Sequence, residues 1–204
     1  MIPSKYIEDA VNEVASLPGV GRKTALRYVL DLLSRSEVEV GRFTKSIDDL
    51  RKNIKLCKVC RNVSDAEICG ICSNNSRDQK TICVVEDIRD VMAIEATHQY
   101  KGLYHVLGGK ISPMDGIGPS DLHIDSLLQR INGQDMKELI LALSSTMEGD
   151  TTSYFIFKKI QKPENVTVST LSRGVAVGDE LQYADELTLG RSIQYRTPYD
   201  KALY

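Results

Sequence analysis

The sequence has no long hydrophobic run: none of its apolar stretches approaches the roughly 18 residues that a membrane-spanning helix needs. Its first residues, MIPSKYIEDA, show neither the basic nor the apolar region of a secretory signal, and no low-complexity tract follows. We therefore expect a cytoplasmic protein in a thiol-reducing setting, where paired cysteines more often bind metal or do redox chemistry than form disulfides. With 42% hydrophobic residues, the 204-residue chain can bury a core, as one domain or as two or three small modules.

Cysteine is scarce outside one segment. Four of the five cysteines lie in residues 57–72, CKVCRNVSDAEICGIC, as two C-x-x-C pairs. Free thiols or a redox pair are the alternatives, but two such pairs favour a tetrahedral zinc site, and the polar loop between them needs a metal to organise it. We expect one structural, non-catalytic zinc ion held by Cys57, Cys60, Cys69 and Cys72. Gly70 suits the tight turn of the second pair, and Cys83, in an apolar run, is expected to be a buried small hydrophobe.

Upstream of the cysteines, the spacing of apolar residues predicts three helices. Two of them, residues 6–17 and 22–33, are joined by the sharp turn Pro18-Gly19-Val20-Gly21. The third leads into the first cysteine pair. Its apolar stripe, which we expect to pack in a core, consists of Phe43, Ile47, Leu50 and Ile54.

The turn between the first two helices has the features of a phosphate site. It exposes backbone N–H groups where the helix dipole favours an anion, and Arg22, Lys23 and Arg27 can flank the same phosphate. An ordinary helical hairpin is the alternative. The stretch L-P-G-V-G, followed by basic residues and an alanine, resembles the helix-hairpin-helix module. That resemblance implies binding of nucleic acid without sequence preference, through Gly19, Gly21, Arg22, Lys23 and Arg27.

Charge is distributed unevenly along the chain. Residues 22–61 contain eleven Lys or Arg against five Asp or Glu, whereas residues 81–204 contain twelve against seventeen. The net charge of −2 therefore hides a basic segment, as expected of a nucleic-acid contact.

After a polar linker at residues 73–80, strands and helices alternate. Strands are predicted at 81–86, 103–107, 138–144 and 166–170, and helices at 87–98, 122–131 and 151–160. Within the last helix, residues 152–157 could equally be a strand by propensity, and only the alternation favours a helix. Functional groups in such a sheet gather at the carboxyl ends of strands, where Glu86, Glu148 and Asp150 are expected. Carboxylates from two adjacent strand ends would ordinarily indicate a magnesium site for phosphoryl transfer.

This layout resembles the Toprim domain of topoisomerases, primases and related nucleases. The resemblance implies a glutamate after the first strand and D-x-D-x-E-G-E after a later one. Glu86 matches the glutamate and residues 148–150 match the E-G-E tail, but the two aspartates fall on Ser144 and Thr146. Hydroxyls are neutral and poor magnesium ligands, so the hypothesis of a Toprim enzyme is weaker than that of a non-enzymatic protein. That enzyme would use Glu86, Glu148 and Asp150.

The order of these parts resembles the RecR family of bacterial recombination mediators over essentially the whole chain. Residues 111–119, ISPMDGIGP, and the tail at 172–199, with R-G-x-x-V-G and Y-A-D-E-x-T-L-G, carry the likeness, while Ala176 replaces the usual proline and Ser144 a common asparagine. The expected fold is an α/β multi-module chain. Its parts are a helix-hairpin-helix region at 1–56, a four-cysteine zinc finger at 57–72, a Toprim domain at 80–175 and a C-terminal oligomerisation segment at 176–204.

The RecR resemblance implies a DNA-binding mediator of recombinational gap repair without catalytic activity. It would act with RecO and RecF to help load RecA on single-stranded DNA, and would form dimers and tetramers that encircle single- or double-stranded DNA. Lys23 and Arg27 would face the DNA, and Glu86, Asp87 and Glu148 would bind partner proteins. Neither a membrane nor a small-molecule substrate is expected, and the protein would be cytoplasmic and nucleoid-associated. Besides the mediator and the Toprim enzyme, a third hypothesis is a zinc-bearing scaffold that does not bind DNA. The basic residues of the helical hairpin argue against it.

Overall fold

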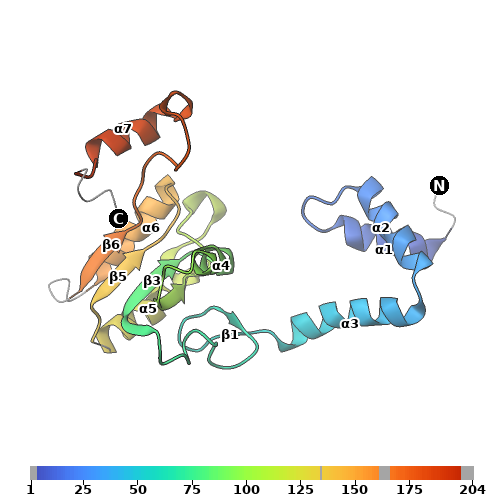
Figure 1. Cartoon of the computed structure of the whole chain (residues 1–204). Helices are drawn as coiled ribbons and strands as arrows, with labels where there is room; N and C mark the ends of the chain where they lie inside the picture. Colours follow the sequence, from blue (N-terminus) through green and yellow to red (C-terminus); the bar gives the residue numbers. More distant parts are fainter. Residues whose placement is uncertain (1–3, 134, 161–165, 199–204) are drawn as a thin grey trace. The chain divides into compact units, whose positions relative to one another are not determined.

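The computed structural model describes residues 4–133, 135–160 and 166–198 (Figure 1). The chain divides into two compact units, residues 1–54 and 55–204. Within the described ranges, no helix has the length and apolar character needed to cross a membrane.

The first unit contains helices α1 (Lys5–Ala15), α2 (Arg22–Ser34) and α3 (Glu37–Asn53). Val11 of α1 packs against Ala25 and Val29 of α2, and all three side chains are buried. Between the two helices Gly19 adopts a left-handed conformation, φ 78°, which explains a glycine at this point of the turn. The two helices and their sharp connection are therefore as predicted from the sequence.

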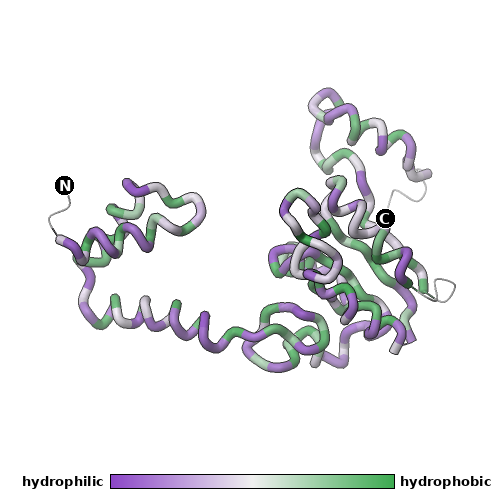
Figure 2. The backbone as a smooth tube through the Cα atoms, turned by 180° about the vertical axis from the view of Figure 1, so that it is seen from behind, coloured by the Kyte–Doolittle hydropathy of each residue, from purple (hydrophilic) through white to green (hydrophobic). Residues whose placement is uncertain are grey.

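Helix α3 corrects one prediction. A capping box at Ser36 and Glu39 begins the helix, but none of its residues is buried. Phe43, Ile47 and Leu50 are 46%, 54% and 61% exposed, so the expectation that they pack in a core of this chain is wrong. Green hydrophobic positions alternate with purple hydrophilic ones along α3 in Figure 2. The periodicity identified an apolar face, but within the described residues nothing covers it.

The second unit opens with a short antiparallel hairpin, β1 (Lys55–Leu56) and β2 (Val63–Ser64). It continues into a four-stranded parallel sheet of β3 (Asp78–Val85), β4 (Gly102–Val106), β5 (Glu138–Leu141) and β6 (Thr167–Thr170), in the order β4-β3-β5-β6. All four predicted strands are present. The first begins inside the expected linker, and the third ends at Leu141 rather than at residue 144.

Helices cover both faces of this sheet. Ile82 and Val84 of β3 pack on the side of α5 (Ile124–Gly133) and α6 (Met147–Lys159), whereas Cys83 and Val85 pack on the side of α4 (Ile88–Ala96). Cys83 is 2% exposed, as expected of a small buried hydrophobe. Residues 152–157 are helical, and α6 begins early enough to include Glu148 and Asp150. Beyond the sheet, 3₁₀ turns occupy Pro113–Asp115, Pro119–Asp121 and Leu181–Tyr183, and α7 spans Glu186–Gln194.

The strand order places a site at one edge of the sheet. The chain passes from β3 to its neighbour β4 on one side and later returns to β5 on the other. Ligands of open parallel sheets bind outside the carboxyl ends of the strands, at the point where the strand order reverses direction. Here those ends belong to β3 and β5, and they bring Glu86 close to the segment that precedes α6.

Candidate metal centre and nucleic-acid interface

The β1–β2 hairpin carries the first cysteine pair. The Cys57 N–H donates to the Asn62 carbonyl at 2.8 Å, and the Arg61 N–H donates to the Cys57 carbonyl at 2.9 Å. Each cysteine pair forms a tight turn, or knuckle. Arg61, which directly follows the first pair, has φ 62° and so adopts the left-handed conformation. Gly70, expected to suit the tight turn of the second pair, lies in that turn, but it has no positive φ, and a Cβ added there meets nothing within 4 Å.

The four thiols of the two pairs come together. The Sγ atoms of Cys57, Cys60, Cys69 and Cys72 lie within 4.8 Å of one another, and only Cys72 is not fully buried. The Cys69 N–H donates to the Cys57 sulfur at 3.3 Å. Burial raises the pKa of the Cys57 thiol, but backbone hydrogen bonds from Cys69, Cys60 and Val59 outweigh it and lower the pKa to about 6. These N–H groups favour the thiolate, the form that binds a metal.

Size and donor type both fit zinc. Zn–S bonds of about 2.3 Å in a tetrahedron hold the sulfurs about 3.8 Å apart. The Cys60 and Cys69 sulfurs are separated by 3.6 Å. A set of four sulfurs is the ligand shell of structural zinc, and it leaves no open position for substrate. One zinc ion per chain belongs here, and its chemistry is to hold the two knuckles together.

The zinc module is also attached to the sheet. The Val106 N–H of β4 donates to the Cys60 carbonyl at 2.8 Å, and Ile71 packs against the apolar clusters on both faces of the sheet as well as against the cysteines. Because β4 is an edge strand, the module covers part of an edge that would otherwise be open.

The turn between α1 and α2 leaves the start of α2 open. Gly21 is the N-cap residue, and no side chain caps the helix. Lys23 and Arg27 are exposed, and the Arg27 guanidinium lies 5.5 Å from the centroid of the Tyr28 ring. Arg22 differs from them, because its guanidinium donates to the side chains of Asn12 at 2.6 Å and Glu8 at 3.3 Å. Of the three cations predicted to face a phosphate, Arg22 is thus engaged with α1.

The two glycines of the turn play different roles. The left-handed φ of Gly19 is a conformational demand. Gly21 has φ −75°, which any residue adopts, and a Cβ at Gly21 would meet nothing within 4 Å. The fold therefore gives no internal reason for a glycine at position 21, whereas close approach of a ligand to the backbone gives one.

At the sheet edge, Glu86 is engaged with the protein itself. Its Oε1 accepts the Ser144 N–H at 2.7 Å, which joins the carboxyl end of β3 to the loop after β5. Asp90 accepts the N–H groups of Glu86 and Asp87 at 3.0 and 3.1 Å. Asp87 caps α4 and pairs with Arg89, and this pairing holds the pKa of Asp87 below its usual range.

A lysine lies among the groups that align with the Toprim metal ligands. The Lys110 Nζ lies 3.3 Å from both the Ser144 Oγ and the Thr146 Oγ1, the hydroxyls at the two aspartate positions. The pKa of Glu148 is lowered by the backbone N–H of that residue and by the Thr146 hydroxyl, with a contribution from Lys110. An ammonium group thus stands beside these side chains, and no spacing pattern in the sequence pointed to Lys110.

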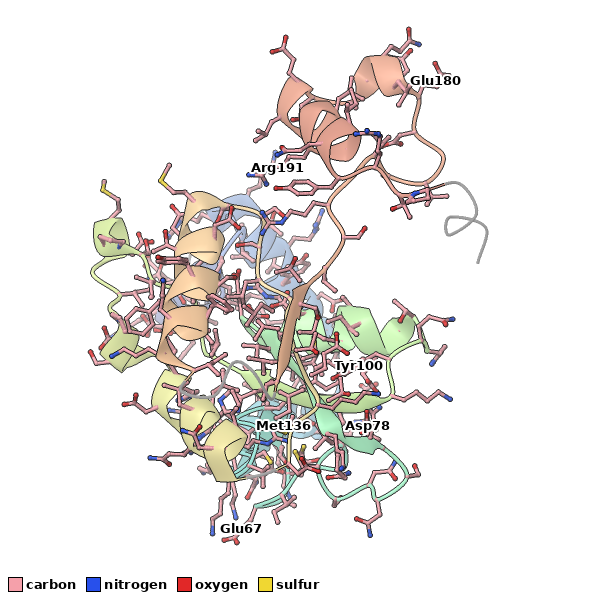
Figure 3. The ribbon with its side chains drawn as sticks, turned by 90° about the vertical axis from the view of Figure 1, so that its left-hand side faces the viewer. Glu67, Asp78, Tyr100, Met136, Glu180 and Arg191 are labelled. Carbon is pink, nitrogen blue, oxygen red and sulfur yellow. The ribbon has the colours of Figure 1, made fainter. Side chains whose placement is uncertain are left out.

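Asp150 binds the C-terminal segment. The Arg173 guanidinium donates to its two carboxylate oxygens at 2.5 and 3.2 Å and lowers its pKa, and Arg191 of α7 lies 3.8 Å away. Figure 3 labels Arg191 on α7, on the side that faces the sheet domain. The third carboxylate of the enzymatic hypothesis is therefore neutralised by two arginines. Sequence analysis missed both of them, because their contacts span 23 and 41 positions of the chain.

Comparison with known proteins identifies the domains of this chain. Family models match in the order RecR helix-hairpin-helix (residues 7–51), RecR four-cysteine zinc finger domain (54–74), Toprim domain (80–172) and RecR C-terminal (174–197). The chain is 60% identical to the recombination protein RecR of Bacteroides thetaiotaomicron over 195 residues, 96% of this chain and 95% of the relative. It is 56% identical to that of Flavobacterium johnsoniae over 198 residues, 97% and 96% of the two chains. These matches show that the chain belongs to the RecR family.

Proposed function

We propose that this chain is a recombination mediator that binds DNA without sequence preference and has no catalytic activity. It acts in gap repair with RecO and RecF, helps RecA load on single-stranded DNA, and assembles through dimers and tetramers into a ring around DNA. Its modules are the four named above, bounded at residues 56, 72 and 175, and it works in the cytoplasm at the nucleoid. The name that the relatives carry, recombination protein RecR, supports the pathway.

The observation that carries DNA binding is the open start of α2 beside exposed Lys23 and Arg27. Free backbone N–H groups and two cations one turn apart recognise a phosphate rather than a base. Gly21, which the fold does not require, leaves room for the phosphate to approach. Gly19 shapes the turn. Arg22 contributes by holding α1 against α2.

The absence of catalysis is supported by the groups at the sheet edge. Protein-bound magnesium is held by carboxylates, with water and phosphate oxygens as its other ligands, but the two aspartate positions hold hydroxyls beside Lys110, and Asp150 is paired with arginines. Glu86 accepts a backbone N–H. Glu86, Asp87 and Glu148 form a partly exposed acidic surface, which we assign to partner proteins.

DNA binding is tested with the double variant Lys23→Ala/Arg27→Ala. Each phosphate contact contributes a slope of about −0.9 to the plot of log affinity against log salt for duplex DNA. We expect the variant to bind about tenfold or more weakly at low salt, with a slope shallower by about 2 per chain bound. Fluorescence anisotropy at several salt concentrations measures both quantities, and circular dichroism checks the fold.

The matched control is Lys5→Ala/Arg35→Ala, which removes the same charge from exposed positions in the same unit. Its affinity should stay near that of the parent. If both double variants lose affinity equally, net charge alone explains binding. If neither loses it, the DNA path lies elsewhere.

A further inference from the structure

A hollow lies between the first zinc knuckle and helix α5. Its volume is about 370 Å³, and the polar side chains that line it are Lys58, Arg61, Ser126, Gln129 and Arg130. It lies wholly within the second unit and is distinct from both the turn before α2 and the acidic surface at the sheet edge.

Arg130 is the unusual member of this group. It is only 8% exposed, and its Nη1 donates to the Tyr104 carbonyl at 2.8 Å. Its Nε and Nη2 are buried and have no hydrogen-bond partner among the described residues, and the same holds for the Nε of Arg61. Charged donors buried without an acceptor are costly, and native proteins leave few of them.

No carboxylate in the described residues pairs with either arginine. The nearby Glu67 forms a salt bridge with Lys58 instead, with 2.8 Å between Lys58 Nζ and Glu67 Oε2. The hydrogen bonds described for the zinc-site sulfurs come from backbone N–H groups and from one another, not from a guanidinium. The other ionisable neighbours, His105 and His123, have pKa values lowered by burial and further by Arg61. Both rings are therefore neutral near pH 7, and the charged side chains that line the hollow, Lys58, Arg61 and Arg130, are all cations.

We propose that this hollow binds a phosphate group through Arg61 and Arg130. A guanidinium presents a planar fork of N–H donors that matches two phosphate oxygens, and phosphate supplies the negative acceptor that both side chains lack. The Gln129 amide and the Lys58 ammonium complete the rim. The phosphate comes either from the backbone of DNA, as a second contact that rests on the proposed function, or from a free phosphate. The experiment separates these two sources.

The probe is inorganic phosphate added to the zinc-loaded full chain. The melting temperature of the parent in phosphate, compared with sodium chloride of equal ionic strength, should rise by about 3–6 °C at ten times the dissociation constant. Arg61→Asn should remove this shift. Asparagine tolerates the left-handed φ of Arg61, so this variant should fold as the parent does. Arg130→Lys keeps the charge but loses the fork, and should weaken the shift.

The control is Lys101→Gln, which removes an exposed cation of the same unit outside the hollow. It should keep the full phosphate shift. The proposal is overturned if phosphate stabilises the parent no more than chloride does, or if Arg61→Asn keeps the shift.

A second arm measures the affinity of each protein for a 12-nucleotide single strand by anisotropy. Loss of affinity in Arg61→Asn, together with loss of the phosphate shift, identifies DNA as the source. Unchanged DNA affinity with loss of the shift identifies a free phosphate. If the parent binds no DNA yet shows the shift, the proposed function fails and the phosphate site stands.

Discussion

The Glu86 carboxylate accepts the backbone N–H of Ser144 at 2.7 Å, and this bond joins the two strand ends where a Toprim enzyme would bind metal. The residue that aligns with the Toprim catalytic glutamate therefore has a structural partner. Glu86→Ala would leave the half-buried Ser144 N–H without its acceptor, so we expect a loss of about 1–2 kcal/mol in the free energy of unfolding. Glu86→Gln keeps an acceptor oxygen and should lose less. Denaturant unfolding of the two variants measures the difference.

The same edge should show no metal chemistry. Because Lys110 lies beside the hydroxyls of Ser144 and Thr146, added magnesium or manganese should neither shift the melting temperature beyond the effect of ionic strength nor support nicking or relaxation of plasmid DNA. Gel assays of supercoiled plasmid measure the latter. Nicking that disappears in Glu86→Ala would restore the enzymatic hypothesis.

Zinc content gives another prediction. Elemental analysis of protein purified without chelator should find one zinc per chain, and Cys72→Ser should lose it. Because the metal holds the knuckles and the module is bonded to β4, the melting temperature of that variant should fall by more than about 5 °C. Gly70→Ala is the control: a Cβ there meets nothing, so zinc and stability should be retained. Full stability without zinc would contradict a structural role for the metal.

The two glycines of the turn should separate folding from binding. Gly19→Ala places a Cβ on a left-handed residue and should destabilise the first unit by about 1–2 kcal/mol. Gly21→Ala meets neither strain nor a clash and should leave stability unchanged, but it should weaken DNA binding by obstructing the backbone N–H groups. Thermal unfolding and anisotropy of the two variants measure these effects. Parent-like DNA affinity in Gly21→Ala would mean that the phosphate does not approach there.

Acid should destabilise the second unit through His105. Its ring is fully buried, its Nε2–H donates to the His123 carbonyl at 2.9 Å, and burial lowers its pKa to about 4. In the unfolded chain His105 binds a proton with a pKa near 6.5, whereas in the folded chain its buried ring stays neutral at that pH. The free energy of unfolding therefore falls as pH drops below about 6.5. Between pH 7.5 and 5.5 the loss from this group is about 1 kcal/mol.

This pH dependence is measured by denaturant unfolding of zinc-saturated protein. His105→Gln should reduce the loss by that amount, whereas His98→Asn, a change at an exposed histidine, should not. An identical pH dependence in the parent and His105→Gln would show that the buried ring does not contribute.

Local patterns were sufficient for several features. The two cysteine pairs predict their own metal site, because C-x-x-C spacing alone turns both sulfurs toward one ion. The Gly19 turn and the first two helices follow from short-range spacing. The resemblance to RecR, carried by motifs along the chain, predicted the order of modules. The alternation of strands and helices predicted an α/β sheet domain.

Other features depend on contacts between distant residues. Glu86 with Ser144, Lys110 with Thr146 and Asp150 with Arg173 each join segments separated by 23 or more positions, and only the strand order brings them together. Periodicity shows that one face of α3 is apolar but not whether anything in the chain covers it, so Phe43, Ile47 and Leu50 were misjudged. In the same way, the sequence shows that residue 130 is an arginine but not whether its charge has a partner. Only its burial at the end of a folded α5, away from any carboxylate in the described residues, shows that its charge lacks a partner.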